Sequence, residues 1–320
     1  MLILSHADVV NLLPMADCIA VIDEAMRALS DGAYFQPLRM KAIPDGVANR
    51  MVFMPSLKKA DPSIWGLKEI VVTPHNSKSG LDSHQGAVLL HDGGTGELLA
   101  AVHAGAITSI RTAAASAVAT HALARKDSKV IAILGTGVQG RAHIEAMRCL
   151  WPDASIRIWS RTLANAATIG ESANVSVAET ISAACEGADV ICAVTAAHEP
   201  ILSPATIPVG CHVNAAGSSI ATTRELDGAA MAAGSLFVDR RESTTVESGD
   251  FILALREKAI GPNHIRAEIG DVLLGRHPGR TSAEEITIYK SLGVAAQDLA
   301  AAELVFRRAR ERHIGVEVAF

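Results

Sequence analysis

The sequence predicts an α/β protein of two domains, one of which contains a doubly wound parallel sheet. A glycine-rich turn, Gly135-Thr-Gly-Val-Gln-Gly140, lies between an apolar run at 129–134 and a helical pattern at 141–147. Further apolar runs and helical segments alternate after it, which is typical of a parallel sheet covered by helices. The segment 36–99 reads instead as strands joined by turns, the pattern of an antiparallel sheet. We therefore expect two architectures in one chain.

Composition excludes several classes of protein. The 320 residues are 49% hydrophobic and 20% charged, enough apolar material for a full α/β core. The net charge of −5 and the absence of a lysine or arginine block indicate neither a nucleic acid nor an anionic membrane as partner. No apolar run approaches about 18 residues and no signal sequence is recognisable, so we expect a cytoplasmic protein. Five cysteines without a Cys-x-x-Cys pair predict no disulfide and no metal site.

The first third of the chain is expected to begin with a strand and two helices. Residues 2–4 can form the strand, Ser5 can cap a helix over 7–13, and Pro14 opens a longer helix that ends near Gly32. The strands expected next are 38–43, 50–54, 66–72 and 86–90, followed by the turn 92–96 and a strand over 98–103.

The remaining elements follow an alanine-rich helix over 107–125 and a polar hinge over 126–128. We expect strands at 129–134, 155–159, 189–194, 211–216 and 236–238, with helices between them at 141–147, 163–173 and 181–186. The last helix, over about 294–312, has an apolar face that predicts packing back on the first domain.

The glycine turn predicts a dinucleotide site. Gly135 allows the tight bend, Gly137 lets a pyrophosphate approach the backbone, and Gly140 lets the helix pack on the strand. The phosphates would then meet the N-terminus of that helix.

The end of the next strand bears on which dinucleotide is bound. No carboxylate stands at Ser160-Arg161-Thr162, where an Asp or Glu would bind the adenosine ribose hydroxyls and repel a 2′-phosphate. Ser160 and the Arg161 guanidinium can bind that phosphate, so we expect NADPH to be preferred, with NADH possible. In the alternative interpretation Arg161 is a solvated arginine at a helix start.

Two further sets of residues could carry chemistry. Thr195, Asn214, Gly217, Ser218 and Ser219 follow or end predicted strands, where the ligand crevice of a doubly wound sheet lies. Arg39, Lys68 and Arg111 interrupt otherwise apolar segments and together resemble an anion pocket, although each alone could be a solvated or helix-end residue. His84 can line the same cleft, whereas His91, Asp82 and Asp92 are most simply structural or turn residues.

Several segments form a specific set when they are taken together: Pro37-Leu-Arg39, Gly66-Leu-Lys68, Ser83-His-Gln-Gly86, Thr108-Ser-Ile-Arg-Thr-Ala-Ala114, Gly135-Thr-Gly-Val-Gln-Gly140, Asn214-Ala-Ala-Gly217, Glu225-Leu226, Glu285-Ile-Thr287 and Ser291-Leu-Gly293. Through them the chain resembles the ornithine cyclodeaminase and mu-crystallin family over nearly its whole length.

The resemblance implies a Rossmann domain (119–295) inserted in an α+β domain for substrate binding and dimerisation (1–118 plus 296–320), and a homodimer. It implies that Arg39, Lys68 and Arg111 hold an amino or imino acid against a nicotinamide, in a substrate site to which Ser83 and His84 also belong. Positions that match cofactor contacts in the family are Thr112, Val138, Gln139, Thr195, Asn214, Gly217 and Ser291.

One departure from the family decides between activities. Cyclodeaminases carry a catalytic aspartate shortly after the Asn-x-x-Gly turn, and here Ser219 stands there. A serine without a neighbouring base cannot do that proton transfer near neutral pH. We therefore expect reduction of Δ1-pyrroline-2-carboxylate to L-proline, and of its six-membered homologue to L-pipecolate, with Lys68 orienting the substrate or relaying a proton. The alternatives are an ornithine cyclodeaminase, an alanine-type dehydrogenase and a non-catalytic NADPH-binding protein like mu-crystallin.

Overall fold

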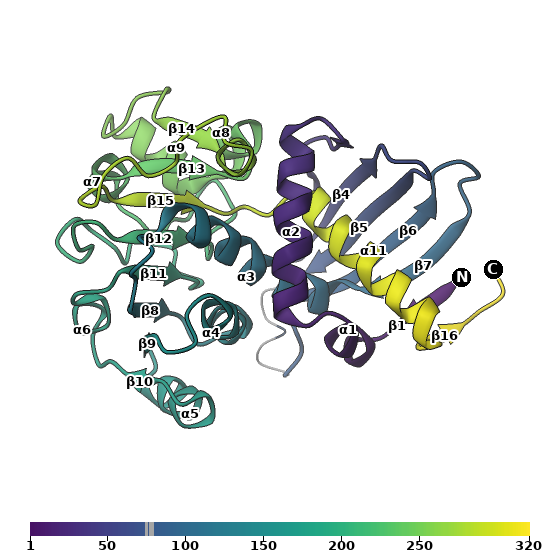
Figure 1. Cartoon of the computed structure of the whole chain (residues 1–320), viewed down its shortest axis with the longest axis horizontal. Helices are drawn as coiled ribbons and strands as arrows, with labels where there is room; N and C mark the ends of the chain where they lie inside the picture. Colours follow the sequence, from purple (N-terminus) through teal and green to yellow (C-terminus); the bar gives the residue numbers. More distant parts are fainter. Residues whose placement is uncertain (74–75, 77–79) are drawn as a thin grey trace. The chain divides into compact units, whose positions relative to one another are not determined.

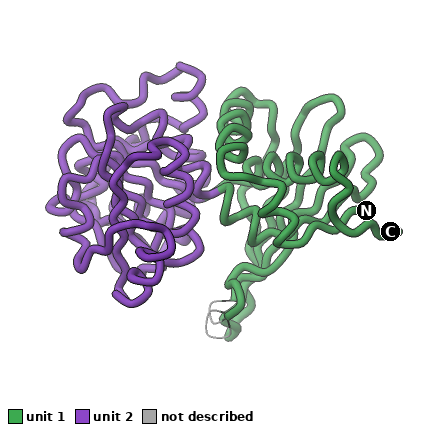
Figure 2. The backbone as a smooth tube through the Cα atoms, turned by 60° about the horizontal axis from the view of Figure 1, so that its bottom comes forward, with its two compact units in different colours: residues 1–111, 293–320 green, residues 112–292 purple. Residues whose placement is uncertain are grey.

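The computed structural model describes residues 1–73, 76 and 80–320 and divides the chain into two compact units (Figure 2). Unit 1 consists of Met1–Arg111 and Gly293–Phe320, and unit 2 of Thr112–Leu292. The expected domains change at 118/119 and 295/296, whereas the units change at 111/112 and 292/293. The chain therefore leaves unit 1 and returns to it, and unit 2 is inserted between its two segments.

Unit 1 contains an eight-stranded sheet in the order β16-β1-β7-β6-β5-β4-β2, with β3 also paired to β4. All its pairs are antiparallel except β1 with β7. The strands are β1 (Leu2–Leu4), β2 (Tyr34–Phe35), β3 (Met40–Ala42), β4 (Arg50–Lys58), β5 (Ile64–Val72), β6 (His84–Asp92), β7 (Leu98–His103) and β16 (Val316–Glu317).

Helices cover one face of this sheet. Helix α11 (Ala295–Arg312) lies across β4, β5 and β6, α2 (Met15–Ser30) packs on α11, and α1 (His6–Leu12) contacts α11 and β7 (Figure 1). Gly66 of β5 permits the close approach of α11, because a Cβ there would lie 2.8 Å from Leu299 Cδ1. The predictions that Ser5 caps α1 and that the last helix returns to the first part of the chain are confirmed.

Unit 2 contains a second eight-stranded sheet in the order β10-β9-β8-β11-β12-β15-β13-β14, and all its pairs are parallel. The strand order reverses between β8 and β11, so a topological switch point lies there. The strands are β8 (Val130–Leu134), β9 (Ser155–Trp159), β10 (Ser176–Val177), β11 (Val190–Ala193), β12 (His212–Ala215), β13 (Ser235–Val238), β14 (Ile265–Glu268) and β15 (Thr287–Lys290).

Helix α3 (Ala104–Leu123) runs from unit 1 into unit 2. The other helices of unit 2 are α4 (Val138–Leu150), α5 (Leu163–Ala173), α6 (Ile181–Cys185), α7 (Gly228–Ala233), α8 (Arg241–Glu247), α9 (Gly249–Arg256) and α10 (Ile269–Leu273). Strands β11 and β12 are buried throughout, as parallel strands covered on both faces should be. The predicted α/β class with a doubly wound sheet is confirmed.

Several expectations about single elements need correction. The strand expected over 38–43 is only Met40–Ala42, and helices α7 to α10 and strands β10, β14, β15 and β16 were not predicted.

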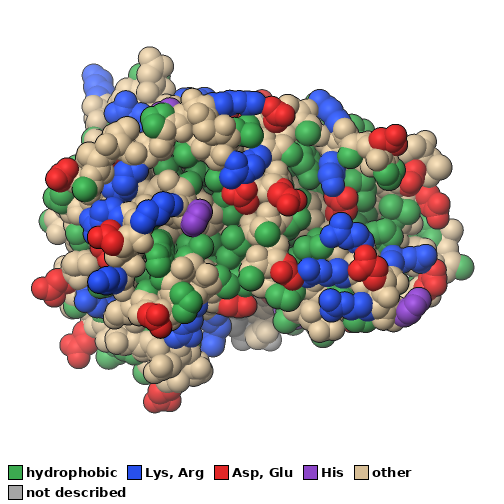
Figure 3. Space-filling view, viewed as in Figure 1, with side chains coloured by type: hydrophobic (Ala, Val, Ile, Leu, Met, Phe, Trp, Pro, Cys, Tyr) green, Lys and Arg blue, Asp and Glu red, His purple; other side chains and the backbone are tan. Residues whose placement is uncertain are grey.

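Four cysteines are buried and Cys149 is exposed, all of them free. In the part of the chain that the structure describes, no helix is both long and apolar enough to span a membrane, and no cluster of His, Cys, Asp or Glu could hold a metal ion. Basic and acidic side chains are interspersed over the visible face in Figure 3.

Candidate active site

The structure brings the three predicted cations together in unit 1. Lys68 projects from the helix-covered face of β5, and its Nζ lies 3.0 Å from Oδ1 of Asp298 on α11. The Nε of Arg111 on α3 lies 2.9 Å from the same oxygen. All three side chains are at most 5% exposed. A buried carboxylate thus joins a buried ammonium to a buried guanidinium.

The backbone before α11 joins the third cation to this cluster. Nη2 of Arg39 donates to the Gly293 carbonyl at 2.7 Å. Gly293 has φ +75°, and a Cβ there would lie 2.7 Å from Arg111 Nη2. Only glycine combines this left-handed conformation with room for the guanidinium. Gly293 therefore allows Arg39 and Arg111 to approach the same stretch of backbone.

Positive charge is in excess at this cluster, since the buried Lys68 and Arg111 share the single carboxylate of Asp298. Burial lowers the pKa of Lys68 to about 8, against the opposing attraction of Asp298. Burial alone would raise the pKa of Asp298, but Arg111 and Lys68 hold it below its ordinary value. Near neutral pH the cluster therefore contains an ionised Asp298 and a mostly protonated Lys68. Such a cluster can bind a small carboxylate and donate a proton.

Two residues of the cluster were not predicted. Asp298 accepts from Lys68 and Arg111, and Gln297 Oε1 accepts from Arg111 Nη1 at 3.0 Å. Both residues are fully buried in the first turn of α11. The available signal was a polar pair next to Leu299, in the alanine-rich first half of a helix with an apolar face. Polar residues at such positions are buried only when they have partners.

Ser83 and His84 lie close to the cluster along the sheet. Register pairs Lys68 with Val88 and Val72 with His84, so Lys68 and His84 are on the same face of the sheet. Ser83 Oγ lies 2.9 Å from His84 Nδ1. Burial, followed by the charge of Lys68, lowers the pKa of His84. Contact of these two residues with a substrate stays a prediction.

The glycine turn of unit 2 has the geometry that a dinucleotide requires. A Cβ at Gly135 (φ +128°) would lie 2.6 Å from the Val194 carbonyl oxygen, and one at Gly140 would strike the carbonyl of Gly135. At Gly137, the N-cap of α4, nothing lies within 4 Å of the Cβ position. The first and third glycines therefore serve close packing, while the second leaves open the approach to the helix N-terminus.

Other predicted cofactor residues lie at the same edge of the unit 2 sheet. Ser160 Oγ, at the end of β9, accepts from Thr136 Oγ1 of the glycine turn at 3.1 Å and from Thr162 N at 3.3 Å. Arg161 and Val138 are exposed. In the described ranges, the buried Gln139 Oε1 and Ser291 Oγ bond to no protein atom. Buried polar atoms of this kind fit a polar ligand such as a dinucleotide.

A buried carboxylate that was not predicted fixes the strand ends in this region. Glu225 Oε1 accepts from the backbone and hydroxyl of Thr195, both at 2.7 Å, and its Oε2 accepts from Gly217 N at 2.7 Å. Burial raises the pKa of Glu225 to about 7. Asn214 is buried and donates to Thr120 Oγ1 at 2.7 Å, and Thr112 is buried in α3. A direct cofactor contact of Asn214 or Thr112 stays a prediction.

Ser219 lies on the loop after β12 and is half-buried. Its neighbour Ser218 is held by bonds from its hydroxyl to Thr223 and from Lys290 Nζ to its carbonyl at 2.6 Å. Lys290 is in turn paired with the buried Asp250 at 2.8 Å. The loop that carries Ser219 is therefore anchored on one side by a buried ion pair.

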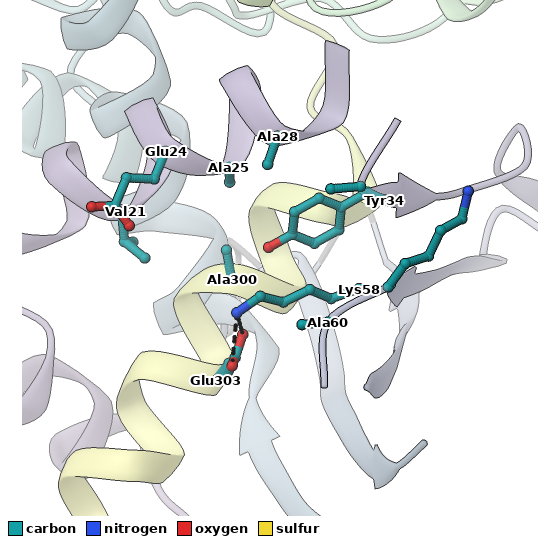
Figure 4. A pocket seen from close by; sticks show the side chains of 11 residues that line it. Val21, Glu24, Ala25, Ala28, Tyr34, Lys58, Ala60, Ala300 and Glu303 are labelled. Carbon is teal, nitrogen blue, oxygen red and sulfur yellow. Dashed lines mark hydrogen bonds and ion pairs between the residues drawn. The ribbon is translucent and has the colours of Figure 1, made fainter. Parts of the chain in front are cut away.

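A separate pocket of about 190 Å³ lies between α2 and α11 of unit 1 (Figure 4). Lys58 points across it to the carboxylate of Glu303 at 2.8 Å, and Tyr34 and alanines form much of the remaining wall. Since its lysine is neutralised by a glutamate, this pocket is a poor site for a carboxylate. It contains none of the predicted site residues.

A parallel sheet with an open glycine turn and a buried cation cluster are features of a dinucleotide-dependent enzyme. The model of the ornithine cyclodeaminase/mu-crystallin family matches residues 1–313, and the chain belongs to this family. The ketimine reductase mu-crystallin of Mus musculus is 38% identical over 281 residues, 86% of each chain.

Two solved structures are similar over the whole chain. A Δ1-pyrroline-2-carboxylate reductase of Thermococcus litoralis in complex with NADH and L-proline has a TM-score of 0.95 and 33% identity, covering 99% of this chain and 100% of that one. An archaeal alanine dehydrogenase dimer with bound NAD has a TM-score of 0.93 and 28% identity, covering 100% and 99%.

Proposed function

We propose that this protein reduces a cyclic imino acid, Δ1-pyrroline-2-carboxylate, to L-proline with a reduced nicotinamide cofactor, and that Δ1-piperideine-2-carboxylate is a second substrate. The observation that carries the proposal is the buried cluster of Lys68 and Arg111 around Asp298, next to the half-buried Arg39 on the Gly293 carbonyl. Its excess positive charge fits a substrate with one carboxylate, and its lysine can donate a proton. The similarity to a reductase of this class in complex with NADH and L-proline supports the assignment.

The cluster supplies two functions to the reaction. Arg111 donates from Nε to Asp298 and from Nη1 to Gln297. Within the described ranges its Nη2 has no protein partner. That nitrogen and the Arg39 guanidinium would hold the substrate carboxylate. Lys68 would donate its proton to the ring nitrogen while C2 gains a hydride, so the C=N bond becomes a C–N bond with one new hydrogen on each atom. A reduced nicotinamide, when bound, would supply the hydride and the two electrons of the reduction. Lys68 then regains a proton from water.

A substrate panel tests this function. Purified protein is incubated with NADPH or NADH and with each imine, and amino acid products are identified by chromatography. We expect cofactor oxidation matched by L-proline or L-pipecolate. Ammonia release from ornithine would favour the cyclodeaminase that Ser219 argues against, turnover of pyruvate with ammonia would favour an alanine-type dehydrogenase, and tight cofactor binding without turnover would favour a binding protein.

We also propose that NADPH is preferred over NADH. The Ser160 hydroxyl accepts a hydrogen bond from Thr136 of the glycine turn, and the exposed Arg161 follows it. The segment 160–162 at the end of β9 contains no carboxylate. A 2′-phosphate on the adenosine ribose would meet a hydroxyl and a guanidinium there rather than a repelling charge.

We propose further that unit 1 forms a homodimer through the uncovered face of its sheet. Residues of β5 alternate between the two faces of the sheet. Ile64, Lys68 and Ile70 are buried under the helices, whereas Trp65 and Val71 on the other face are 39% and 37% exposed. Phe35 of β2, 50% exposed, packs edge-on against Trp65. Figure 1 shows α2 and α11 on the same side of this sheet. A second copy would cover this apolar face. The similar archaeal alanine dehydrogenase is a dimer, which supports a dimer here.

A further inference from the structure

Asp298 has an arrangement that charge neutralisation alone does not explain. Its Oδ1 accepts from both Lys68 Nζ and Arg111 Nε, whereas its Oδ2 is buried and bonds to no atom of the described residues. A carboxylate that only neutralised two cations could offer one oxygen to each. Here both donors converge on one oxygen, which places the ammonium beside the guanidinium.

We propose that Asp298 is a positioning residue of the reaction: it fixes the Lys68 ammonium next to Arg111 and keeps it protonated, so that Lys68 can donate to the substrate nitrogen while Arg111 holds the carboxylate. The proposal rests on the reductase function proposed above. It assigns to Asp298 no contact with the substrate.

The segment 293–298 supplies partners to all three cations. The Gly293 carbonyl accepts from Arg39, Gln297 accepts from Arg111, and Asp298 accepts from Arg111 and Lys68. The close packing of α11 on β5 at Gly66 sets the distance between Asp298 and Lys68. The first turn of α11 and the residues just before it therefore serve as a scaffold for the whole cluster.

The charges around Lys68 explain why an anion is needed there. Arg111 on α3 and Arg39 before β3 disfavour its protonated form, and burial acts in the same direction. Asp298 on α11 opposes them. His84 on β6 has its own pKa lowered, and Cys18 on α2, near Asp298, has a pKa raised by burial, so neither adds a charge near neutral pH. Asp298 is therefore the anion that keeps Lys68 a proton donor near neutral pH.

Asp298→Asn tests the proposal, with Glu303→Gln as the matched control. Both changes convert a carboxylate on α11 to an amide, but Glu303 pairs with Lys58 at the half-exposed pocket of Figure 4. In the wild type, kcat/KM for the imine should fall as pH rises through about 8, the pKa of Lys68. Asp298→Asn should move this fall to lower pH by about one unit or more, as expected for loss of a charge in direct contact. Glu303→Gln should leave it in place.

A second variant keeps the test decisive if Asp298→Asn does not fold. Asp298→Glu retains the charge but displaces the carboxylate, so the pH profile should stay near that of the wild type while kcat falls at least about tenfold through misplacement of Lys68. An unshifted profile in Asp298→Asn, or full kcat in Asp298→Glu, would overturn the proposal.

A measurement without turnover separates this proposal from the proposed function. The ¹³Cε resonance of Lys68 in lysine-labelled protein, assigned by its loss in Lys68→Arg, should titrate near pH 8 in the wild type and at lower pH in Asp298→Asn. Equal midpoints would refute the role of Asp298 whatever the substrate is. A shifted midpoint in a protein that reduces none of the imines would instead refute the reductase function and leave the Asp298–Lys68 coupling standing.

Discussion

Arg111 carries two protein contacts and one expected substrate contact on a single guanidinium. Its Nε bonds to Asp298 and its Nη1 to Gln297, and the planar group directs Nη2 elsewhere. A lysine has one nitrogen at the end of a flexible chain and cannot reproduce this arrangement.

Arg111→Lys should therefore lower kcat/KM for the imine by about 10- to 100-fold, the equivalent of roughly 1.4 to 2.7 kcal/mol. Steady-state kinetics with the imine varied measures this effect. Cofactor binding, followed by the fluorescence of bound NADPH, should be unchanged because the glycine turn belongs to unit 2. Ordinary kinetics in Arg111→Lys would assign the residue a structural role only.

Arg161 offers a test of cofactor choice at the level of one side chain. It is exposed at the end of β9, and removal of a charge-assisted contact to a phosphate should cost about 1 to 3 kcal/mol. Arg161→Ala should therefore raise KM for NADPH while KM for NADH stays nearly constant. Parallel kinetics with the two cofactors provide the comparison, and an equal rise in both would remove the argument for a 2′-phosphate contact.

Sequence reasoning at the residue scale found the cations but not their partners. Arg39, Lys68 and Arg111 are recognisable because each interrupts an apolar segment. Asp298 is separated from Lys68 by 230 residues, so only the tertiary fold shows that they meet. Glu225 was noticed within a motif, but its bonds to Thr195 and Gly217 depend on the spacing between two parallel strands.

At the element scale, the long periodic segments were predictable and the short elements of unit 2 were not. Helix α5 (Leu163–Ala173) has the predicted bounds, whereas β15 was missed because Thr287 and Lys290 give it a polar appearance. Lys290 is fully buried because Asp250, on α9, neutralises it. The ion pair between Lys290 and Asp250 therefore allows β15 to be a buried strand of the sheet, although its sequence contains a lysine.

Glu225 joins two of these elements, since its carboxylate bonds to the loops after β11 and β12. In Glu225→Gln an amide NH₂ would face the N–H of Gly217 or Thr195, which leaves a buried donor unsatisfied at a cost of about 1 to 3 kcal/mol. We expect a lower melting temperature and weaker NADPH binding, measured by thermal unfolding with and without cofactor.

Glu257→Gln is the control for this change, because Glu257 is 45% exposed, against the full burial of Glu225, and pairs with Arg224 at 2.7 Å. It should leave both quantities nearly unchanged. If Glu225→Gln behaves like Glu257→Gln, the loops after β11 and β12 do not depend on the buried carboxylate.

At the scale of the whole molecule, the change from an antiparallel to a parallel sheet was predictable from the change in pattern near 100–130. The return of the last helix to unit 1 was predictable from its apolar face. The point at which one unit gives way to the other was not, because α3 is a continuous helix that crosses from Arg111 to Thr112 with no break in pattern. Capping residues, glycine and proline indicate in a sequence where a helix begins or ends. A boundary between units that lies within a helix has no such signal.

The sheet of unit 1 gives the last prediction. On its uncovered face, Leu67 of β5 is paired in register with Leu89 of β6 and Pro55 of β4, so an apolar patch crosses three strands. In a homodimer this patch would be buried twice, once in each copy, and a charge at its centre would have to be buried without a partner.

Leu67→Asp should therefore convert the proposed dimer to monomer. Light scattering after gel filtration should give a mass near twice the 33.4 kDa of the chain for the wild type, and near 33.4 kDa for the variant. Val246→Asp is the matched control, since Val246 lies on α8 of unit 2 and is 52% exposed. Circular dichroism separates dissociation from unfolding. A monomeric wild type, or a folded Leu67→Asp variant that stays dimeric, would show that this sheet face does not carry the dimer contact.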